Sequence, residues 1–345
     1  MTGIGNYFIG NGEFEVREMA FRPLQSGEVL LKNMACGVCG TDVHIMKGEK
    51  GSADVNPPVV LGHEYAGLVL EIADDVRNVR VGDQVTVDPN IYCGRCRYCH
   101  NGQKHFCESM QAVGVTRDGG FAQYSIVPCA QVFPMNPDIG YENMAMAEPL
   151  ACCLHGIAQI DIHPGDAACV VGGGAIGLIM AQLLKLKGAG KVYLSEAMEE
   201  RRKRAWTAGF VDKAFVPGDR LVEEIREELH RPGMDVVVEC AGNPKAVRSA
   251  IDMADRGGRV LLFSVPKPDS SVELPLFDVY KKELKISGSF INPDTHQQAV
   301  ELLNSGRVNM QALFTHRFPL KDLATAIQTQ ATPAAVKVLV KPWEE

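Results

Sequence analysis

The chain has no apolar run long enough to cross a membrane. Its longest uncharged apolar stretch covers residues 167–181 and contains four glycines, whereas a spanning helix needs about 20 apolar residues. Residues 1–16 contain no basic segment followed by an apolar one, so we expect no signal peptide. Internal repeats and low-complexity segments are also missing. We therefore expect a soluble, cytoplasmic protein.

An excess of positive charge is missing as well. The 35 Lys and Arg residues are outnumbered by 42 Asp and Glu, which gives a net charge of −7. This balance argues against nucleic acid or an anionic membrane as the main partner. With 46% hydrophobic and 22% charged residues over 345 positions, the composition predicts about two folded domains rather than a disordered chain.

The 11 cysteines are an odd number, which does not suit a complete disulfide framework. Several of them lie alone in apolar surroundings, namely Cys129, Cys152, Cys153, Cys169 and Cys240. Isolated cysteines of this kind are typical of buried free thiols in a reducing cytosol.

Four other cysteines are clustered with the spacing C-x2-C-x2-C-x7-C, at Cys93, Cys96, Cys99 and Cys107. Four thiolates in one hairpin-like loop can close a tetrahedral shell around a single Zn²⁺, with no position left for substrate. A disulfide pair and an iron–sulfur cluster are the alternatives, but the first needs an oxidising compartment and the second usually has tighter spacing at its last ligand. We predict a structural zinc lobe over about residues 88–110, and chemistry elsewhere.

The pattern of apolar runs and turn residues divides the chain into three segments. Residues 1–152 contain short apolar runs between Gly, Pro and Asp turns, which predicts a β-rich domain. In residues 153–290, expected strands (168–171, 191–195, 236–238, 260–263, 284–287) alternate with helices such as 176–187. This alternation predicts a doubly wound parallel sheet. Residues 291–345 contain an expected helix at 297–304 and a strand at 335–340.

A glycine motif, G-x-G-x-x-G, follows the expected strand 168–171, at Gly172, Gly174 and Gly177. In this context the glycines allow a tight turn, the close approach of a pyrophosphate and tight strand–helix packing. Glu196 ends the next strand, where its carboxylate can accept hydrogen bonds from both ribose hydroxyls and would repel a 2′-phosphate. This residue therefore favours NAD over NADP. The alternatives are a glycine turn without a ligand, and NADP bound by the basic run 201–204.

A second metal centre is indicated by Cys39, by His63 with Glu64, and by Glu148. One thiolate, one imidazole and one carboxylate do not close a tetrahedron, so a position remains for water or a substrate oxygen, as catalytic zinc requires. Taken singly, His63 could be an ordinary structural residue, and Cys36, which precedes Cys39 in the same segment, could be a buried thiol. Their occurrence together with the cysteine cluster and the glycine turn favours the metal site.

These motifs together resemble the zinc-containing medium-chain dehydrogenases, over essentially the whole chain. The residues that carry the resemblance are 39–44 (CGTDVH), 62–64 (GHE), the four-cysteine cluster, Glu148 with Pro149, and the glycine turn. The resemblance implies a GroES-like catalytic domain from residues 1–152 and 291–345, and a Rossmann domain from 153–290, with the active site between them.

The resemblance also implies roles for single residues. Cys39 and His63 match the fixed zinc ligands, and Glu64 and Glu148 match carboxylates that bind the metal directly or through water. Asp42 matches the acceptor that orients the zinc histidine. Thr41 and His44 match the path that carries the alcohol proton to solvent. Further residues match cofactor contacts: Ile176, Glu196, Arg201, Val265 and Ser289.

Within the family, Glu148-Pro-Leu-Ala151 is similar to the polyol and sugar-alcohol branch. That branch implies oxidation of a secondary alcohol to a ketone by hydride transfer to NAD. Two positions depart from animal-type sorbitol dehydrogenase: Ile45 replaces an aromatic residue, and Ile291-Asn292 replaces an Arg-Tyr pair. Residues 41–45 (TDVHI) also resemble the threonine dehydrogenase branch, so a β-hydroxy amino acid is the second substrate hypothesis and a phosphorylated polyol the third.

Other classes of protein fit the sequence less well. A non-catalytic NAD-binding regulator would be expected to lose Cys39, His63 or Thr41, and all three are present. A zinc-ribbon nucleic-acid binder is disfavoured because this net-acidic chain lacks a long basic face. A zinc hydrolase with a vestigial nucleotide fold would be favoured by a failure to bind NADH. By resemblance we expect a homodimer or homotetramer joined through the strand at 284–287, with a small-molecule alcohol as the substrate.

Overall fold

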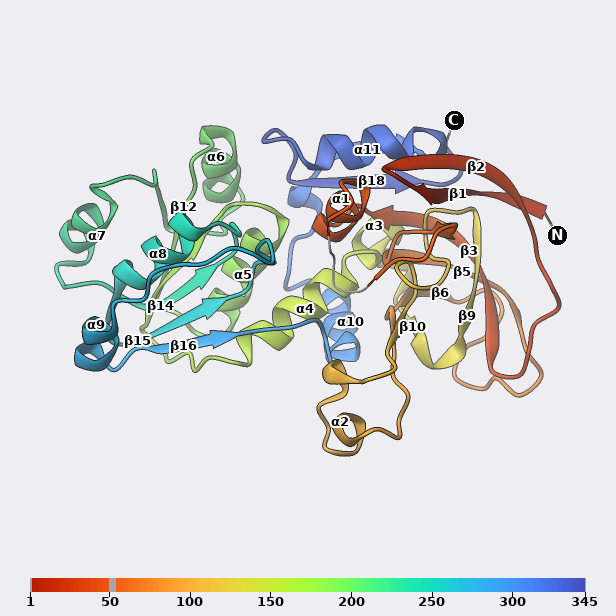
Figure 1. Ribbon diagram of the computed structural model, residues 1–345, viewed down its shortest axis with the longest axis horizontal. Coiled ribbons are helices and arrows are strands. Elements are labelled where there is room, and N and C mark those ends of the chain that lie inside the picture. The colour runs from red at the N-terminus through yellow and green to blue at the C-terminus, as the bar shows by residue number, and fades with distance from the viewer. Residues whose placement is uncertain (1, 50–53, 345) are drawn as a thin grey trace. The chain divides into compact units, whose positions relative to one another are not determined.

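The computed structural model describes residues 2–49 and 54–344. The chain folds into two units (Figure 1). Unit 1 contains Met1–Ala151 and Asn292–Glu345, and unit 2 contains Cys152–Ile291. In the described part of the chain, no helix is long and apolar enough to cross a membrane.

Unit 1 is β-rich, as the short apolar runs predict. Its largest sheet has seven strands in the order β10-β6-β5-β3-β18-β17, and β9 also pairs with β3. A three-stranded sheet, β2-β1-β4, and the pair β7-β8 complete the unit. The strands are β1 (Thr2–Gly10), β2 (Glu13–Ala20), β3 (Glu28–Gly37), β4 (Val59–Val60), β5 (Glu64–Ile72), β6 (Gln84–Val87), β7 (Asn90–Ile91), β8 (Gln111–Ala112), β9 (Tyr124–Pro128), β10 (Val132–Pro134), β17 (Phe314–Pro319) and β18 (Lys337–Lys341).

The helices of unit 1 are short. They are α1 (Gly40–Met46), α2 (Arg97–His100), α3 (Tyr141–Met144), α10 (His296–Asn304) and α11 (Leu323–Gln330), with single 3₁₀ turns at Lys104–Phe106, Cys129–Gln131, Pro137–Ile139, Gln311–Leu313 and Leu320–Asp322. A longer helix, α4 (Ala147–Ile157), begins in unit 1 and continues into unit 2, which starts at Cys152. The core is aliphatic and aromatic, and Leu31, Tyr65 and Phe121 have no exposed surface.

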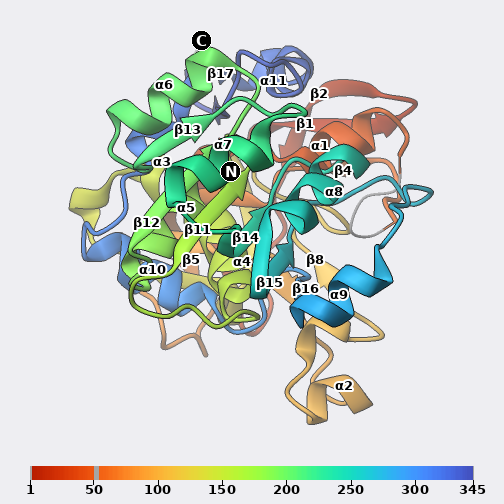
Figure 2. The ribbon, with the colours of Figure 1, turned by 90° about the vertical axis from the view of Figure 1, so that its left-hand side faces the viewer.

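Unit 2 is a parallel sheet with helices beside it, and Figure 2 shows these strands. The strand order is β13-β12-β11-β14-β15-β16, and every neighbouring pair is parallel. The elements are β11 (Ala167–Val171), α5 (Ala175–Leu186), β12 (Lys191–Ser195), α6 (Glu199–Thr207), β13 (Lys213–Phe215), α7 (Leu221–Leu229), β14 (Met234–Glu239), α8 (Pro244–Met253), β15 (Ala254–Leu262), α9 (Leu276–Lys282) and β16 (Lys285–Gly288).

This strand order confirms the predicted doubly wound fold. Counted along the chain from β11, the strands lie in the order 3-2-1-4-5-6, which is that of a dinucleotide-binding sheet. The order reverses between β11 and β14, and ligands bind outside the carboxyl ends of the strands at such a point. All five residues of β11 are buried, as expected for a central parallel strand.

The four-cysteine segment is the expected hairpin-like loop, with two helical turns that the sequence analysis did not predict. It contains the single turn α2 and the 3₁₀ turn Lys104–Phe106, and the short pair β7–β8 closes it at its base. Figures 1 and 2 both show α2 in a lobe that projects from unit 1. A helical turn brings Cys96, its N-cap, and Cys99 to one side of the lobe, because residues three apart share a helix face.

Candidate active site

The start of α1 arranges the first candidate zinc ligand. Cys39 is the N-cap of α1, and its backbone N–H donates a 2.8 Å hydrogen bond to the Asp42 carboxylate, at the third position of the helix. A carboxylate at this position satisfies an N–H group that the first helical turn leaves without a partner. Local sequence therefore fixes both the backbone at Cys39 and the place of Asp42.

Three candidate ligands converge in unit 1. Atoms of Cys39, His63 and Glu64 that could bind a metal all lie within 4.8 Å of one another. Glu64 is the first residue of β5, and His63 precedes it. The carboxylate and the imidazole are buried, with 2% and 6% of their surface exposed, and Cys39 is half-buried. One sulfur, one nitrogen and one oxygen donor suit a zinc ion with an open coordination position.

The charges around His63 also suit a cation. Burial alone lowers the pKa of His63, but the charge of Cys39, a hydrogen bond with that residue, and the charges of Asp42 and Glu148 raise it well above its usual value. Burial also raises the pKa of Asp42 to about 6, against the opposing effect of His63. The nearest approach of Asp42 Oδ1 to His63 Nδ1 is 4.0 Å. A metal ion is the kind of charge that this anionic, desolvated group of side chains accommodates.

Lys337 is a member of this group that the sequence analysis missed. It lies on β18, 3% exposed, with its ammonium group paired to Glu64 and donating to the carbonyl oxygen of Val38 at 3.0 Å. Burial alone lowers the pKa of Lys337, but the charges of Glu64, Cys39 and Glu148 raise it above the usual value. A protonated lysine therefore holds the carboxylate that is also the candidate oxygen ligand.

The second candidate carboxylate, Glu148, lies in the first turn of α4 and is 8% exposed. It is near enough to His63 and Lys337 to raise the pKa of both. It is not part of the group within 4.8 Å that contains Glu64. Both carboxylates thus belong to one electrostatic cluster, with Glu64 nearer to Cys39 and His63.

The candidate proton path lies on α1, where Thr41 and His44 are one turn apart and both half-buried. The Nδ1 atom of His44 is 2.6 Å from the Glu49 carboxylate. Glu49 is the second site residue that the sequence analysis missed. The signal that could have found it is the glycine at position 48, which ends the helix and turns the chain back.

Among residues 2–49 and 54–344, the four cysteines of the projecting lobe form the other group of metal-binding atoms within 4.8 Å. All four are free thiols, so the disulfide alternative is not realised. Backbone N–H groups of Cys99 and Glu108 lower the pKa of Cys96 to about 6, whereas burial raises the pKa of Cys99 to about 12. Amide donors directed at sulfur stabilise the thiolate, which is the form that binds zinc.

In unit 2 the glycine turn has the predicted geometry. Gly174 is the N-cap of α5, and Gly172 has a φ of +102°, which favours glycine. A Cβ atom at Gly177 would lie 1.9 Å from the carbonyl oxygen of Gly172, so only glycine fits where the helix meets the turn. The N-terminus of α5 therefore opens directly after β11, as a pyrophosphate site requires.

A cavity of about 1140 Å³ lies at this turn. Of the predicted cofactor residues, Gly172, Gly174, Glu196 and Arg201 line it, whereas Ile176, Gly177, Val265 and Ser289 do not. Lining residues that the sequence analysis missed include Asn243 and Lys245, at the start of α8, and Arg248. They come from the loop and helix after β14, beyond the reach of a local motif.

Glu196 is held firmly beside the turn. Its carboxylate accepts hydrogen bonds from the backbone N–H groups of Gly173 at 2.6 Å and Met198 at 2.7 Å, and it lies 3.8 Å from Arg201. The side chain is 7% exposed. A fixed anion at this edge of the cavity accepts ribose hydroxyls and repels a 2′-phosphate.

Asn292, at one of the positions that depart from sorbitol dehydrogenase, has no exposed surface. Its amide group donates to Asp88 at 3.3 Å and accepts from Asn90 at 2.7 Å. Burial raises the pKa of Asp88 to about 6, against these hydrogen bonds. Asn292 therefore ties the returning chain to Asn90 of β7 and to Asp88.

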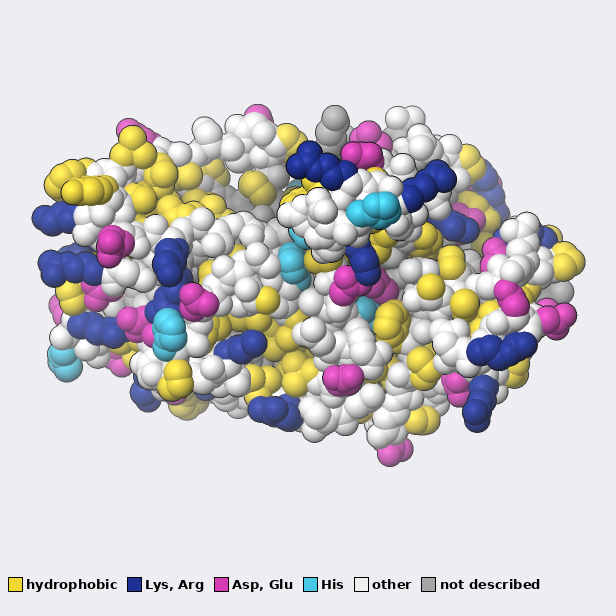
Figure 3. All heavy atoms as spheres, turned by 90° about the horizontal axis from the view of Figure 1, so that it is seen from below, with side chains coloured by type: hydrophobic (Ala, Val, Ile, Leu, Met, Phe, Trp, Pro, Cys, Tyr) yellow, Lys and Arg dark blue, Asp and Glu magenta, His cyan; other side chains and the backbone are white. Residues whose placement is uncertain are grey.

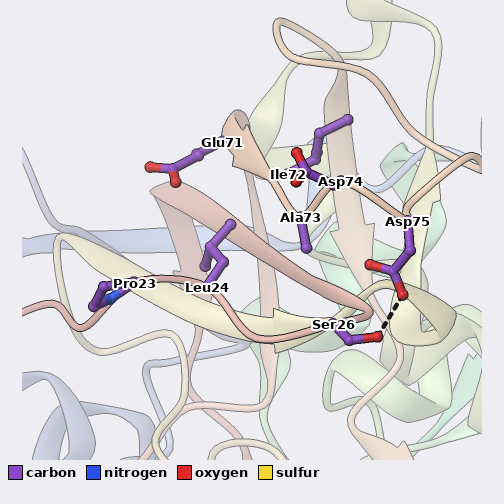
Figure 4. A pocket seen from close by; sticks show the side chains of 8 residues that line it. All are labelled: Pro23, Leu24, Ser26, Glu71, Ile72, Ala73, Asp74 and Asp75. Atoms are coloured by element: carbon purple, nitrogen blue, oxygen red, sulfur yellow. Dashed lines mark hydrogen bonds between the residues drawn. The ribbon is translucent and has the colours of Figure 1, made fainter.

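A second hollow and one face of the protein show no such chemistry among their described residues. A hollow of about 470 Å³ in unit 1 is lined by Glu71, Asp74, Asp75 and apolar neighbours, and the Ser26 hydroxyl donates to Asp75 at 2.5 Å (Figure 4). Its lining contains no histidine or cysteine. On the face drawn in Figure 3, basic and acidic side chains are interspersed, without a continuous basic surface.

Comparisons with known proteins show the family of the chain. The family described as "Alcohol dehydrogenase GroES-like domain" matches residues 25–137, and "Zinc-binding dehydrogenase" matches residues 175–305. The chain is 33% identical to D-arabinitol dehydrogenase 1 of Uromyces fabae over 97% of its length and 96% of the relative. It is 30% identical to sorbitol dehydrogenase of Bacillus subtilis over 96% of its length and 94% of the relative. It is also 33% identical to L-threonine 3-dehydrogenase of Caldanaerobacter subterraneus, over 91% of both chains.

Among solved structures, the chain is similar to a putative zinc-binding dehydrogenase of Sinorhizobium meliloti, bound to NADP, with a TM-score of 0.94 and 37% identity over 99% of this chain and 100% of the other. The fold and the two groups of ligands define a metal-binding, dinucleotide-dependent oxidoreductase. The chain belongs to the zinc-binding alcohol dehydrogenases, as its resemblance predicts, and is an NAD(P)-dependent enzyme of that family.

Proposed function

We propose that the protein oxidises a secondary hydroxyl of a polyol or sugar alcohol to the ketone and transfers the hydride to NAD. The convergence of Cys39, His63 and Glu64 carries this proposal. The D-arabinitol and sorbitol dehydrogenases among the relatives support the polyol class. Zinc, when bound, supplies a Lewis acid that makes the substrate hydroxyl more acidic.

Each predicted site residue then has a specific role. Cys39 and His63 hold the metal, with Glu64 or Glu148 as the third ligand. Asp42 orients His63 and also fixes Cys39 through its backbone N–H. Thr41 takes up the hydroxyl proton of the substrate as it gives its own hydroxyl proton to the path through His44, and His44 releases one proton to solvent. Gly172, Gly174, Ile176, Gly177, Glu196, Arg201, Val265 and Ser289 bind the dinucleotide. Cys93, Cys96, Cys99 and Cys107 hold a second, structural zinc ion.

The test is a substrate panel monitored by NADH absorbance, with pentitols, hexitols, polyol phosphates, inositols and L-threonine. We expect turnover of at least one polyol, and about two zinc ions per chain by metal analysis. Cys39→Ser and His63→Ala should lose turnover by at least about a thousandfold, because each removes a ligand of the reacting centre. Near-normal turnover in either variant would exclude the assignment.

L-Threonine is the second candidate substrate. The Caldanaerobacter relative is named for that activity, and its sequence identity to the chain, 33%, equals that of the D-arabinitol enzyme. Turnover confined to L-threonine in the same panel would replace the polyol class and leave the zinc ligands and the proton path as proposed.

NAD is the proposed coenzyme because Glu196 is fixed at the edge of the cavity. Wild-type enzyme should have the higher kcat/KM with NAD. Glu196→Gln should reduce that preference by about tenfold or more, because it removes the charge that accepts the ribose hydroxyls and repels a 2′-phosphate. Because the Sinorhizobium relative binds NADP, kcat/KM must also be measured with NADP. A wild-type preference for NADP would exclude this part of the proposal.

A cytoplasmic location and a homo-oligomeric state are also proposed. All 11 cysteines are free thiols, which fits a reducing compartment. In unit 2, β16 is the last strand of its sheet, and α9, the helix before it, exposes Leu276, Phe277 and Tyr280 by 73%, 67% and 79%. An exposed apolar group beside a sheet edge is typical of a subunit contact.

A further inference from the structure

The C-terminal end of α1 is closed by a pair of backbone hydrogen bonds. The N–H of Gly48 donates to the carbonyl oxygen of Ile45 at 3.0 Å, and the N–H of Glu49 donates to that of His44 at 2.9 Å. Gly48 has a φ of +71°, the left-handed conformation that this helix ending requires at its first residue beyond the cap. The chain therefore reverses at Gly48 and brings Glu49 back over the last turn.

This reversal joins Glu49 to His44 a second time, through the side chains. The Glu49 carboxylate lies 2.6 Å from Nδ1 of His44, slightly shorter than the length of about 2.7–2.9 Å that is typical of a charge-assisted N–H···O hydrogen bond. The two side chains are 30% and 27% exposed. A backbone bond and a side-chain bond between the same two residues restrict the rotation of the ring more than either bond alone.

The chemistry of the two groups determines where the proton lies. An ionised carboxylate can only accept hydrogen bonds, so Nδ1 of His44 must carry the hydrogen. In a neutral imidazole with a hydrogen on Nδ1, Nε2 is the acceptor. A relay histidine needs such a bare nitrogen to take up the proton that leaves the substrate.

We propose that Glu49 is a positioning residue that fixes His44 with its hydrogen on Nδ1 and so keeps Nε2 ready to accept the substrate proton. The proposal rests on the proposed function, in which His44 passes that proton to solvent. When Nε2 takes the proton the ring becomes an imidazolium cation, and its positive charge lies beside the Glu49 carboxylate. The cation then returns one proton to water, so no further reactant is needed.

The direct test is the ¹⁵N NMR spectrum of the histidine rings in the intact, zinc-loaded enzyme, at a pH where the rings are neutral. The chain has 9 histidines, and the signal of His44 is the one missing in His44→Gln. Wild type should show hydrogen on Nδ1. Glu49→Ala should move it largely to Nε2, whereas Glu49→Gln should keep it on Nδ1, because the amide oxygen still accepts the bond.

Turnover should follow the position of the hydrogen. We expect Glu49→Ala to lower kcat about tenfold, the cost of one hydrogen bond to a charged group, with KM little changed. Glu49→Gln should recover most of that loss. Glu71→Ala, a matched loss of an exposed carboxylate elsewhere in unit 1, should change neither the spectrum nor kcat.

Gly48→Ala provides a second, independent variant. A Cβ atom there meets no other atom within 4 Å, so the substitution strains only the backbone turn. It should displace an intact Glu49 and reproduce the spectrum of Glu49→Ala. Thermal melting of each variant checks that the fold is kept.

The outcomes separate this proposal from the proposed function. If His44→Gln turns over normally, the proton path itself is wrong, although the spectrum still reports the pairing of Glu49 with His44. If His44→Gln loses turnover but Glu49→Ala keeps either the wild-type spectrum or the wild-type kcat, the role assigned to Glu49 is wrong.

Discussion

Lys337 is a buried cation whose partner, Glu64, is also a candidate metal ligand. Lys337→Met leaves that carboxylate without its cation in a desolvated site, so we expect a loss of about 3–5 kcal/mol of unfolding free energy. The double variant Glu64→Gln/Lys337→Met should lose less than the sum of the two single changes, because neither charge is then left alone.

The measurement is urea unfolding in a Trp206→Phe background. The chain has two tryptophans, and the remaining one, Trp343, is fixed in unit 1 by a hydrogen bond to the carbonyl oxygen of Asn33. Lys341→Met is the control on the same strand. Its ion pairs with Glu142 and Glu344 are partly exposed, so it should cost at most about 1 kcal/mol. Equal effects of Lys337→Met and Lys341→Met would contradict the argument.

His296 predicts a pH dependence of stability. Only 1% of the residue is exposed, neither ring nitrogen has a hydrogen-bond partner within the described residues, and burial lowers the pKa of His296 to about 3. The unfolded chain takes up this proton near the usual pKa of about 6.5, but the folded protein does not. The unfolding free energy should therefore fall as the pH is lowered from about 6.5 toward 3, by at most about 1.4 kcal/mol per pH unit.

Replacing His296 by leucine should remove this dependence. Because a buried polar ring without partners is also lost, His296→Leu should gain about 1–3 kcal/mol near neutral pH. Urea unfolding at about pH 8 and about pH 5, with Trp343 as the probe, measures both effects. His100→Leu, which changes an exposed histidine, should keep the wild-type slope. An unchanged slope in His296→Leu would assign the pH dependence to other groups.

Among the elements, the cysteine lobe depends most directly on a metal. It consists of α2, one 3₁₀ turn and the short pair β7–β8, and its four sulfurs lie within 4.8 Å of one another. So small an element has little apolar surface to bury and is stabilised by its ligands. Cys96→Ser should lose about one zinc ion per chain and increase hydrogen exchange over residues 88–110.

Metal analysis and hydrogen exchange by mass spectrometry provide the measurement. Cys129→Ser is the control, because Cys129 lies in unit 1 but outside the cluster, and it should keep both zinc ions. NADH binding should survive in Cys96→Ser, since the glycine turn and its cavity belong to unit 2. An unchanged zinc content in Cys96→Ser would mean that the lobe is not a metal site.

The elements that the sequence predicts well are those set by local patterns. The glycine turn, the strands 167–171 and 191–195 and the helix between them follow from residues close in the chain. The partner of Glu64 could not be found in this way, because Lys337 lies 273 residues further on. Asn292 and Asp88 are likewise 204 residues apart. Such pairs depend on which strands and loops the tertiary fold brings together, and local propensity does not determine these long-range contacts.

At the scale of the whole molecule, the exposed aromatic residues of α9 in unit 2 predict self-association. Phe277 and Tyr280 lie on one helix, α9, with ring centroids 6.4 Å apart, next in sequence to the edge strand β16. Phe277→Glu/Tyr280→Glu places two like charges where a second copy would bury aromatic surface, at a cost of several kcal/mol. Light scattering after size exclusion should show an oligomer for wild type and a monomer for this variant. Trp206→Glu, at a 64% exposed aromatic residue on α6, should leave the oligomer intact. If the double variant keeps the wild-type mass, subunits associate through another surface, and α9 must then be exposed for a different reason.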